Sequence, residues 1–377
     1  IRTCLHEMIE TDDPKVASAF RGALDKIVTQ HGTPALANIA ENAQSILYAR
    51  HESRGRFRNL LNDWILKTNC ALRQLAIEPK LWRTVLNSIE HAEKNEELYD
   101  DKNGFIRWSR AEGSPGAILN TNGTLWNGNG IRRRLADGSL AKLINNCDSD
   151  FIFFGETKAA PYKLARPWEL RRALAHKGYH HCYWNWSPTD PGNWGCAFFS
   201  KIKPLSVRTG LNDDTVDEQG RTITLRFTNA TLIAHYNKCS DINAERDETR
   251  VAWDAALSRH VSTERGLQPN TFLIGDLNVA PKTRDAQVGP NDGTFPSTRN
   301  HEREDFQRLL DTNAMEDAQG ALDKAPLPTW SSGGRQGLRT ATGEPYTMRL
   351  DLAIAPRSRI GRGEPDGGPR VASVGRD

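Results

Sequence analysis

Short apolar runs rich in β-branched and aromatic residues recur through the second half of the chain, each bounded by polar turn formers. Such runs predict β-strands, here at 124–126, 151–155, 195–199, 222–227, 231–235, 271–275 and 350–355. Amphipathic segments that predict helices lie between several of them, at 167–176, 245–260 and 300–310. Strands mixed with helices over this length indicate a single large α/β domain.

The first part of the chain follows a different pattern. From residue 1 to about 108, proline is rare and apolar residues recur at helical spacing, as in Val16, Phe20, Leu24 and Val28. Turn formers then dominate residues 111–123. We therefore predict a mostly α-helical region of unknown function at 1–117 and the α/β domain at 118–377.

The composition excludes several classes of protein. A chain of 377 residues with 37% apolar content is neither wholly disordered nor fibrous, and no stretch predicts a membrane span. Its six cysteines are dispersed without a Cys-x-x-Cys pair, which favours a reducing, intracellular compartment, nuclear in a eukaryote, over a disulfide framework. The net charge of +3 is too small to identify a polyanionic partner.

Polar clusters flank four of the predicted strands. Their sequences are Trp-Asn-Gly-Asn-Gly-Ile-Arg at 126–132, Gly-Glu-Thr-Lys at 155–158, Gly-Asp-Leu-Asn at 275–278 and Arg-Leu-Asp at 349–351. A strand end holds a carboxylate or carboxamide on a rigid base, as a metal or phosphate site requires. A turn or a helix cap is the structural alternative for any one cluster. Their recurrence within one domain favours a shared site.

The side chains in these clusters indicate which metal they would bind. Carboxylate and carboxamide oxygens without Cys or His at motif spacing predict a hard cation, Mg²⁺ or Mn²⁺, rather than zinc. His180-His181-Cys182 lacks the second ligand pair that a zinc site needs. A hard cation neutralises charge that develops on a phosphate diester while another group prepares water. No small-molecule cofactor is predicted.

The order and the amino-acid sequences of the clusters resemble those of the exonuclease III / AP endonuclease branch of the endonuclease/exonuclease/phosphatase superfamily, over about residues 120–377. The resemblance extends to Trp-Gly-Cys-Ala-Phe-Phe-Ser-Lys at 194–201, Val-Ala-Pro at 279–281 and Thr-Trp at 329–330. It implies a four-layer α/β sandwich, in which two mixed β-sheets pack face to face with helices outside. It also implies metal-dependent hydrolysis of DNA phosphodiester bonds, with DNA as partner and DNA repair as one setting; the oligomeric state stays open.

The resemblance further implies roles for individual residues. Glu156 would be the principal metal ligand, with Asn129 at a position where the family often has a supporting Asp. Asp276 would orient and activate the attacking water. The rest of the catalytic and phosphate-binding network would comprise Asn127, Tyr236, Asn278 and Asp351. A core tyrosine is the main structural alternative for Tyr236, and a plain strand-end carboxylate is the alternative for Asp351.

The two ends of the sequence carry a further expectation. In the family, the carboxylate corresponding to Asp351 pairs with the histidine of a C-terminal Ser-Asp-His motif. The resemblance makes Asp377 the Asp of this motif, a further metal-site residue, with the histidine following it outside the given sequence. Because the chain also begins at Ile1 without an initiator Met, we predict a fragment whose activity is impaired.

Candidate DNA contacts complete the prediction. Arg132 and Arg133 follow the first cluster and would contact phosphates, with a solvated helix face as the alternative. Trp330 and Met348 would contact the nucleotide, but Thr329 and Met348 stand where relatives have aromatics that wall an abasic-sugar pocket. A looser pocket favours a retrotransposon-type nicking endonuclease. The alternative function is a catalytically inactive nuclease fold kept as a nucleic-acid-binding or assembly module.

Overall fold

The structure is a computed structural model that describes residues 97–100, 105–109, 114–118, 121–161, 164, 167–213, 216–243, 246–288, 293–322, 327–333, 338–340, 342–361 and 371. The chain divides into two compact units, residues 1–113 with 161–183 and residues 114–160 with 184–377. Most of the predicted helical region lies outside the described residues. Its helical character and the domain boundary at 117/118 therefore stay predictions.

In the first unit, β1 (Glu97–Asp100) and β2 (Phe105–Ser109) form an antiparallel pair. The helix α8 (Pro167–His176) also belongs to this unit and coincides with a predicted helix. β1 and β2 lie within the region predicted to be mostly α-helical, so that region also contains strands. Aromatic residues and the Asn-Gly dipeptide at 103–104 are hairpin signals that outweigh a helical spacing over so short a run.

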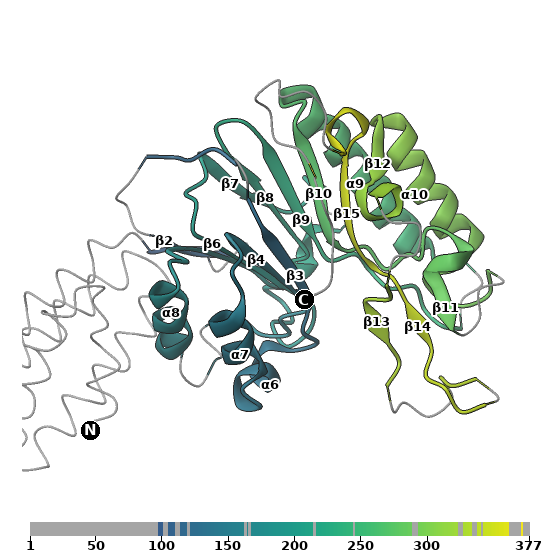
Figure 1. Ribbon diagram of the computed structural model, residues 1–377, viewed down its shortest axis with the longest axis horizontal. Helices are drawn as coiled ribbons and strands as arrows, with labels where there is room; N and C mark the ends of the chain where they lie inside the picture. Colours follow the sequence, from purple (N-terminus) through teal and green to yellow (C-terminus); the bar gives the residue numbers. More distant parts are fainter. Residues whose placement is uncertain are drawn as a thin grey trace, which may run out of the picture. The chain divides into compact units, whose positions relative to one another are not determined.

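One sheet of the second unit is built around two parallel strands. β3 (Gly123–Asn127) runs parallel to β4 (Phe151–Gly155), and β6 (Cys196–Ser200) is antiparallel to β4. The last residues of β5 (His181–Asn185) continue the sheet beyond β6. Parallel strands need a crossover connection. α6 (Ile131–Ala136) and α7 (Ser139–Asn146) provide it on the outer face of the sheet (Figure 1).

The other large sheet of this unit has the strand order β12-β15-β10-β9-β8-β7. The strands are β7 (Ser206–Thr209), β8 (Thr222–Arg226), β9 (Thr231–His235), β10 (Thr271–Asp276), β12 (Met315–Asp317) and β15 (Asp351–Pro356). β9 and β10 are parallel, and the other neighbouring pairs are antiparallel. The connection from β9 to β10 runs through α9 (Glu248–Leu267).

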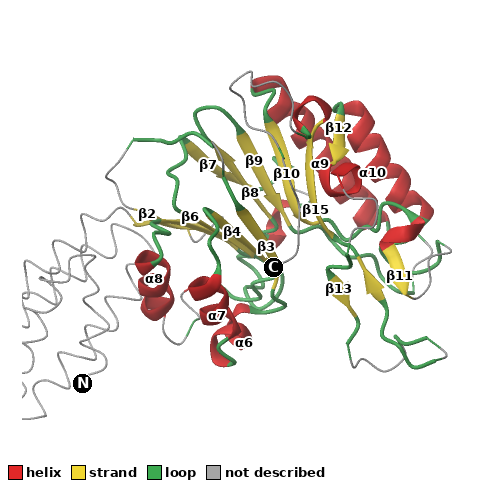
Figure 2. Cartoon of the chain, viewed as in Figure 1, coloured by secondary structure: helices red, strands yellow, loops and turns green. Residues whose placement is uncertain are grey.

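Helices cover the outer face of this second sheet. α9 and α10 (Asn300–Thr312) lie side by side beyond β10 and β15 (Figure 2). Their apolar faces share one core cluster with the strands, in which Trp253, Leu257, Leu273, Phe306 and Ile354 are all at least nine-tenths buried. This burial of apolar surface holds the helices against the sheet.

A small third sheet lies at one end of the unit. β11 (Ala286–Val288), β14 (Thr347–Met348) and β13 (Trp330–Ser331) pair antiparallel in that order. The remaining short elements are α11 (Ala318–Leu322), the 3-10 turns Asp217–Gln219 and Thr283–Asp285, and a last 3-10 turn Arg357–Arg359. The cluster Ala280, Ala286, Met348 and Leu350 packs beneath Trp330 and Phe295.

Gly275 marks a close approach of strands inside the sandwich. Its φ is +134°, and a Cβ there would lie 1.9 Å from the His235 carbonyl oxygen and 2.9 Å from the Phe153 ring. Phe153 belongs to β4 and His235 to β9, so the glycine lies where the two large sheets face each other. Any larger residue would collide with the neighbouring backbone.

The predicted fold class is confirmed. Figures 1 and 2 show the two large sheets of the second unit face to face, with α6 and α7 outside one and α9 and α10 outside the other. The predicted strands at 151–155 and 231–235 have the observed bounds, and the other predicted strands are present with small shifts at their ends. None of the helices in the described part of the chain has the length and apolar character needed to cross a membrane.

Candidate active site

Strand ends deliver the candidate residues to one edge of the sandwich. Asn127 ends β3, and Glu156 follows β4 directly; the parallel register places Asn127 opposite Gly155. Asp276 ends β10 and faces Asp351, the first residue of β15, across an antiparallel pair. Residues far apart in the chain thus meet because neighbouring strands end at the same level.

Two side-chain hydrogen bonds connect the two large sheets at this edge. The Asn127 carboxamide Nδ2 donates to Asp276 Oδ2 at 2.6 Å. The Tyr236 hydroxyl, one residue beyond β9, donates to Glu156 Oε1 at 2.6 Å. Glu156 and Asp276 therefore belong to a single cluster, because each is bonded to a residue that lies next to the other.

The loop after β10 is held rigidly. The Asn278 backbone N–H donates to Asp276 Oδ1 at 2.9 Å, and the Asn278 carboxamide donates to the Asn237 carbonyl at 2.9 Å. Arg250 of α9 donates to the carbonyls of Leu277 and Asn278 at 3.1 and 2.9 Å. Asn278 also has a left-handed φ of 46°. Such a conformation persists only where the surroundings fix it.

The two facing aspartates have altered acidities. Burial raises the pKa of Asp276, and the neighbouring Glu156 charge adds to the rise, against the hydrogen bonds from Asn127 and Asn278 that lower it. Burial also raises the pKa of Asp351, and the charge of Asp276 raises it further. Two carboxyls this close resist being ionised together. The pair therefore keeps a proton at a higher pH than isolated aspartates would.

Arg221 holds Tyr236 in place through its ring face and its backbone. The sequence analysis did not identify Arg221 as a site residue. The Arg221 guanidinium lies 4.4 Å from the centre of the Tyr236 ring and donates to the carbonyls of Tyr236 and Asn237 at 3.3 and 3.1 Å. Burial raises the pKa of Tyr236 well above its ordinary value, although Arg221 opposes the rise. The hydroxyl therefore stays protonated and can donate at neutral pH.

Asn129 and Lys158 form a polar pair beside Glu156. The Lys158 Nζ donates to Asn129 Oδ1 at 2.7 Å and lies 3.5 Å from Glu156 Oε1. The Asn129 backbone N–H donates to Asn127 Oδ1 at 3.1 Å. Lys158 was part of the quoted Glu-Thr-Lys motif, but the sequence analysis gave it no role.

The residues predicted to contact DNA differ in their exposure to solvent. Arg132 and Arg133 are exposed on α6, and Trp330 is partly buried on β13. Met348 is only 1% exposed and packs with Trp330, and its contact with DNA stays a prediction. Asp377, and any residue after it, lies outside the described residues, so the histidine partner of Asp351 stays a prediction.

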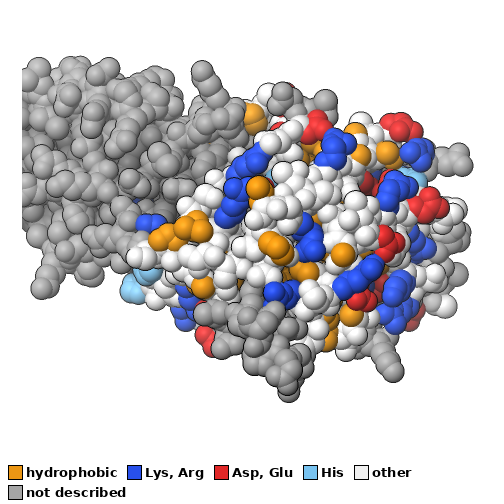
Figure 3. Space-filling model, turned by 90° about the horizontal axis from the view of Figure 1, so that it is seen from above, with side chains coloured by type: hydrophobic (Ala, Val, Ile, Leu, Met, Phe, Trp, Pro, Cys, Tyr) orange, Lys and Arg blue, Asp and Glu red, His pale blue; other side chains and the backbone are white. Residues whose placement is uncertain are grey.

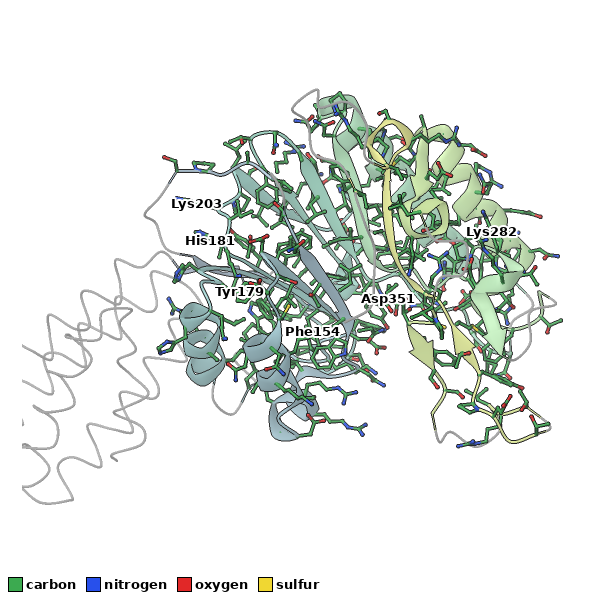
Figure 4. All side chains as sticks on the ribbon, viewed as in Figure 1. Phe154, Tyr179, His181, Lys203, Lys282 and Asp351 are labelled. Carbon is green, nitrogen blue, oxygen red and sulfur yellow. The ribbon has the colours of Figure 1, made fainter. Side chains whose placement is uncertain are left out.

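Thr329 holds the backbone at the start of β15, next to Asp351. The Thr329 hydroxyl oxygen accepts from the N–H groups of Leu350 and Asp351, both at 3.0 Å. Figure 4 labels Asp351 at the lower end of β15, close to where the first sheet ends. Thr329, predicted only as a missing aromatic, thus fixes the start of the strand that carries Asp351.

Surface charge adds little to this picture. On the face shown in Figure 3, Lys and Arg side chains are interspersed with Asp and Glu. The pattern agrees with the small net charge of +3.

The donor set can be tested against the predicted metal. In the part of the chain that the structure describes, no group of three or more His, Cys, Asp or Glu side chains is arranged to hold a metal ion. Glu156 offers a carboxylate, and Asn129 lies near it with a carboxamide oxygen. This set fits a hard cation that keeps several waters and uses one or two carboxylates. It does not fit zinc, which takes closed sites of sulfur and nitrogen ligands.

Comparison with known proteins identifies the class. A model of the "Endonuclease/Exonuclease/phosphatase family" matches residues 119–372, and the chain therefore belongs to this family. An AP endonuclease from Archaeoglobus fulgidus has a similar structure, with a TM-score of 0.51 at 20% identity, covering 63% of this chain and 88% of that one. The 3′ phosphatase NExo from Neisseria gives a TM-score of 0.52 at 23% identity with the same coverage. At these identities the likeness shows the fold.

Individual relatives narrow the assignment. The chain is 30% identical to an exodeoxyribonuclease of Bacillus subtilis over 191 residues, which cover 51% of this chain and 71% of that protein. It is 29% identical to the DNA repair nuclease APEX1 of Danio rerio over 196 residues, which cover 52% of this chain and 61% of that protein. These relatives confirm the resemblance to the exonuclease III / AP endonuclease branch.

Proposed function

We propose that the chain hydrolyses DNA phosphodiester bonds with a divalent cation. The observation that carries the proposal is the pair of hydrogen bonds, each 2.6 Å, that brings Asp276 and Glu156 into one cluster through Asn127 and Tyr236. A buried carboxylate of raised pKa beside a second carboxylate is the arrangement expected of a base next to a cation ligand. The DNA nucleases among the relatives supply the substrate class.

Asp276 is the base in this proposal. Both of its oxygens are held, one by Asn127 Nδ2 and the other by the Asn278 N–H. The carboxylate is thereby fixed in orientation and can position a water molecule for in-line attack. Because burial raises the pKa of Asp276, it is a stronger base than a surface aspartate. Its ionised form accepts the proton of the water.

The phosphate would be held by neutral donors. Asn127 and Asn278 carry carboxamide donors on fixed backbone. Tyr236 keeps its proton because burial raises its pKa, and it would join them when its hydroxyl turns from Glu156 Oε1 to the phosphate. Donors aimed at the phosphate oxygens would stabilise the negative charge that grows in the transition state. Arg132 and Arg133 would bind flanking phosphates, and Trp330 would contact the nucleotide.

Glu156 is the proposed metal ligand, supported by Asn129, and Mg²⁺ is the expected ion, with Mn²⁺ as a substitute. When bound, the ion would neutralise charge on the phosphate, which is worth several kcal/mol in the barrier. Tyr236 orients the Glu156 carboxylate by its 2.6 Å hydrogen bond.

The residues at positions 329 and 348 bear on which kind of DNA the chain would cut. Met348 is buried and Thr329 bonds the backbone, so neither supplies the aromatic wall expected of a strict abasic-site pocket. This favours nicking of intact duplex, as in a retrotransposon-type endonuclease, over repair of abasic sites. Cleavage of a plain supercoiled plasmid and of an oligonucleotide with one abasic site, compared at equal enzyme, tests the choice.

One observation favours a second candidate, a nuclease fold that binds nucleic acid without cutting it. The ammonium of Lys158 lies 3.5 Å from Glu156 Oε1 and partly neutralises the proposed metal ligand. A binding module would retain the basic contacts of Arg132 and Arg133 and show no cation-dependent cleavage. Binding and cleavage must therefore be measured on the same preparation.

The test compares Asp276→Asn and Glu156→Gln with the parent chain in a plasmid-nicking assay with Mg²⁺. We expect each substitution to lower the rate by about 10²–10⁴-fold, the range for loss of a general base or charge-stabilising group. Glu248→Gln removes a carboxylate whose side chain is 75% exposed on α9 and serves as the matched control.

The outcomes separate the candidates. Nicking that survives both Asp276→Asn and Glu156→Gln at the parent rate contradicts the proposed active site. Tight DNA binding without any cation-dependent nicking selects the binding module. Loss of nicking in Glu248→Gln as well would show that the assay reports general damage to the fold.

A further inference from the structure

The proposed hydrolysis of DNA gives Lys158 no role. Its Nζ donates to Asn129 Oδ1 at 2.7 Å and lies 3.5 Å from Glu156 Oε1. Because the Asn129 carboxamide is neutral, the charge of Lys158 is balanced by Glu156. Building on the proposed function, we propose that Lys158 is a tethered cation on Glu156 that a divalent metal ion must displace, and that the neutral residue at position 129 creates this competition.

The backbone confines any displacement to the side chain. Four backbone hydrogen bonds hold the Glu156–Lys158 loop from both sides: Gly130 N and Ile131 N donate to Glu156 O and Thr157 O at 2.8 Å, and Thr157 N and Lys158 N donate to Gly195 O and Trp194 O at 3.0 and 2.7 Å. The Lys158 side chain is 35% exposed. It therefore has solvent to move into while its Cα stays fixed.

Backbone conformation shows that this cluster is held in place. Asn129, Glu156 and Lys158 have left-handed φ values of 49°, 56° and 47°. Non-glycine residues are uncommon there, and Asn and Asp are the least disfavoured. An aspartate can therefore replace Asn129 without changing the backbone, which makes Asn129→Asp a conservative test of charge alone.

The competition has a direct electrostatic consequence. A cation approaching Glu156 meets a carboxylate whose charge Lys158 already offsets, and it is repelled by the ammonium itself. Tyr236 is a neutral donor to the same oxygen, so its hydrogen bond is compatible with a bound cation. Lys158→Gln removes the competing charge, and Asn129→Asp supplies Lys158 with a carboxylate of its own. Both changes should tighten cation binding.

The experiment measures Mn²⁺ affinity of the full chain without DNA, from the electron paramagnetic resonance signal of free Mn²⁺. We expect Lys158→Gln and Asn129→Asp to bind Mn²⁺ about three- to fivefold more tightly than the parent, the scale of a partly exposed ion pair. Lys158→Arg keeps the charge and should match the parent within about twofold. Arg133→Gln makes the same charge change at an exposed position of α6 and should also stay within about twofold.

Each outcome has one meaning. Should Glu156→Gln abolish Mn²⁺ binding while Lys158→Gln and Asn129→Asp leave the affinity unchanged, the competition is refuted and the metal ligand stands. Mn²⁺ affinity that is unaltered in Glu156→Gln refutes the metal ligand and the competition together. An equal gain in Mn²⁺ affinity in Arg133→Gln also refutes the proposal, because the loss of any nearby positive charge would then explain the effect. Because an aspartate at position 129 would itself be a cation ligand, the decisive comparison is that of Lys158→Gln with Lys158→Arg, and Lys158→Met replaces Lys158→Gln if that variant does not fold.

Discussion

Buried acidic side chains occur in two settings in the second unit. Around Arg349, both carboxylates have a guanidinium partner: Arg349 Nε bonds Asp285 Oδ1 at 2.8 Å, and its Nη atoms bond both oxygens of Asp317 at 3.1 and 2.5 Å. We call these three residues the Arg349 clamp. In the active site, Asp276 is bonded instead by an Asn127 carboxamide and an Asn278 N–H, which carry no charge.

The presence or absence of a bonded guanidinium explains the pKa shifts in the two settings. Burial lowers the pKa of Arg349, but its bonds to Asp285 and Asp317 outweigh that effect and raise the pKa overall. Asp276 has no such partner, and burial raises its pKa. Where only stability matters, the fold places an arginine against buried acids. Where a base is needed, it leaves the buried carboxylate of Asp276 without a directly bonded cation.

The largest effect should come from breaking the clamp. Arg349→Met keeps a long side chain but leaves two carboxylates buried without a counter-charge, since Asp285 is 0% and Asp317 7% exposed. Removing one partner of a buried ion pair costs about 3–5 kcal/mol. We expect a loss of that size in the free energy of unfolding, measured by urea denaturation.

The matched change in the active site should behave differently. Asp276→Asn removes a buried charge that no cation bonds directly, which offsets the loss of about one hydrogen bond. We expect a stability change of at most about 1 kcal/mol alongside the large loss of nicking. A loss under 1 kcal/mol in Arg349→Met, or one above 3 kcal/mol in Asp276→Asn, would contradict the comparison.

A smaller effect should appear in the pH dependence of stability. Because the pKa of Asp276 is raised in the folded protein, the folded state binds a proton at pH values where the unfolded chain, with an aspartate pKa of about 3.9, does not. Stability contributed by this group therefore increases as the pH falls through the folded pKa towards 3.9. The parent should gain stability relative to Asp276→Asn as the pH falls towards 3.9.

Urea denaturation of both proteins at pH 8, 7, 6 and 5 measures this difference. The comparison is necessary because burial lowers the pKa of His260 to about 4 and that of His235 to about 3, which destabilises the parent and the variant equally as the pH falls. If the parent loses stability relative to the variant on acidification, the pKa of Asp276 is lowered and its role as a strong base is wrong.

Local sequence predicted most of the fold of the second unit but not every boundary. Short runs such as 151–155 carry their own strand signal, and their bounds agree with β4. The helix predicted at 245–260 instead covers Glu248–Leu267, because the Asp247 side chain accepts from Thr249 N and Arg250 N and sets a later start. β5 and β7 were missed because neither has an alternating pattern with clear turn signals on both sides.

The site was predictable where its residues belong to contiguous motifs. Glu156, Asp276 and Asn127 lie in such motifs, and the structure brings them together. Arg221 was not predictable, because it meets Tyr236 through the face of a ring 15 residues away. A single basic residue at the start of a strand gives no local signal of that contact. The same holds for the Arg349 clamp, whose partners lie 64 and 32 residues away.

The smallest effect should come from an arginine–aspartate pair on the surface. Arg357 Nη bonds Asp311 Oδ1 at 2.6 Å, as short as the bonds of the clamp, but the two side chains are 52% and 57% exposed. Water and salt screen such a pair, which is typically worth about 0–1 kcal/mol. Arg357→Gln should therefore lower the free energy of unfolding by less than about 1 kcal/mol, and the loss should disappear in about 1 M NaCl. A loss close to that of Arg349→Met would mean that distance rather than burial sets the strength of these pairs, and the contrast between the clamp and the active site would lose its basis.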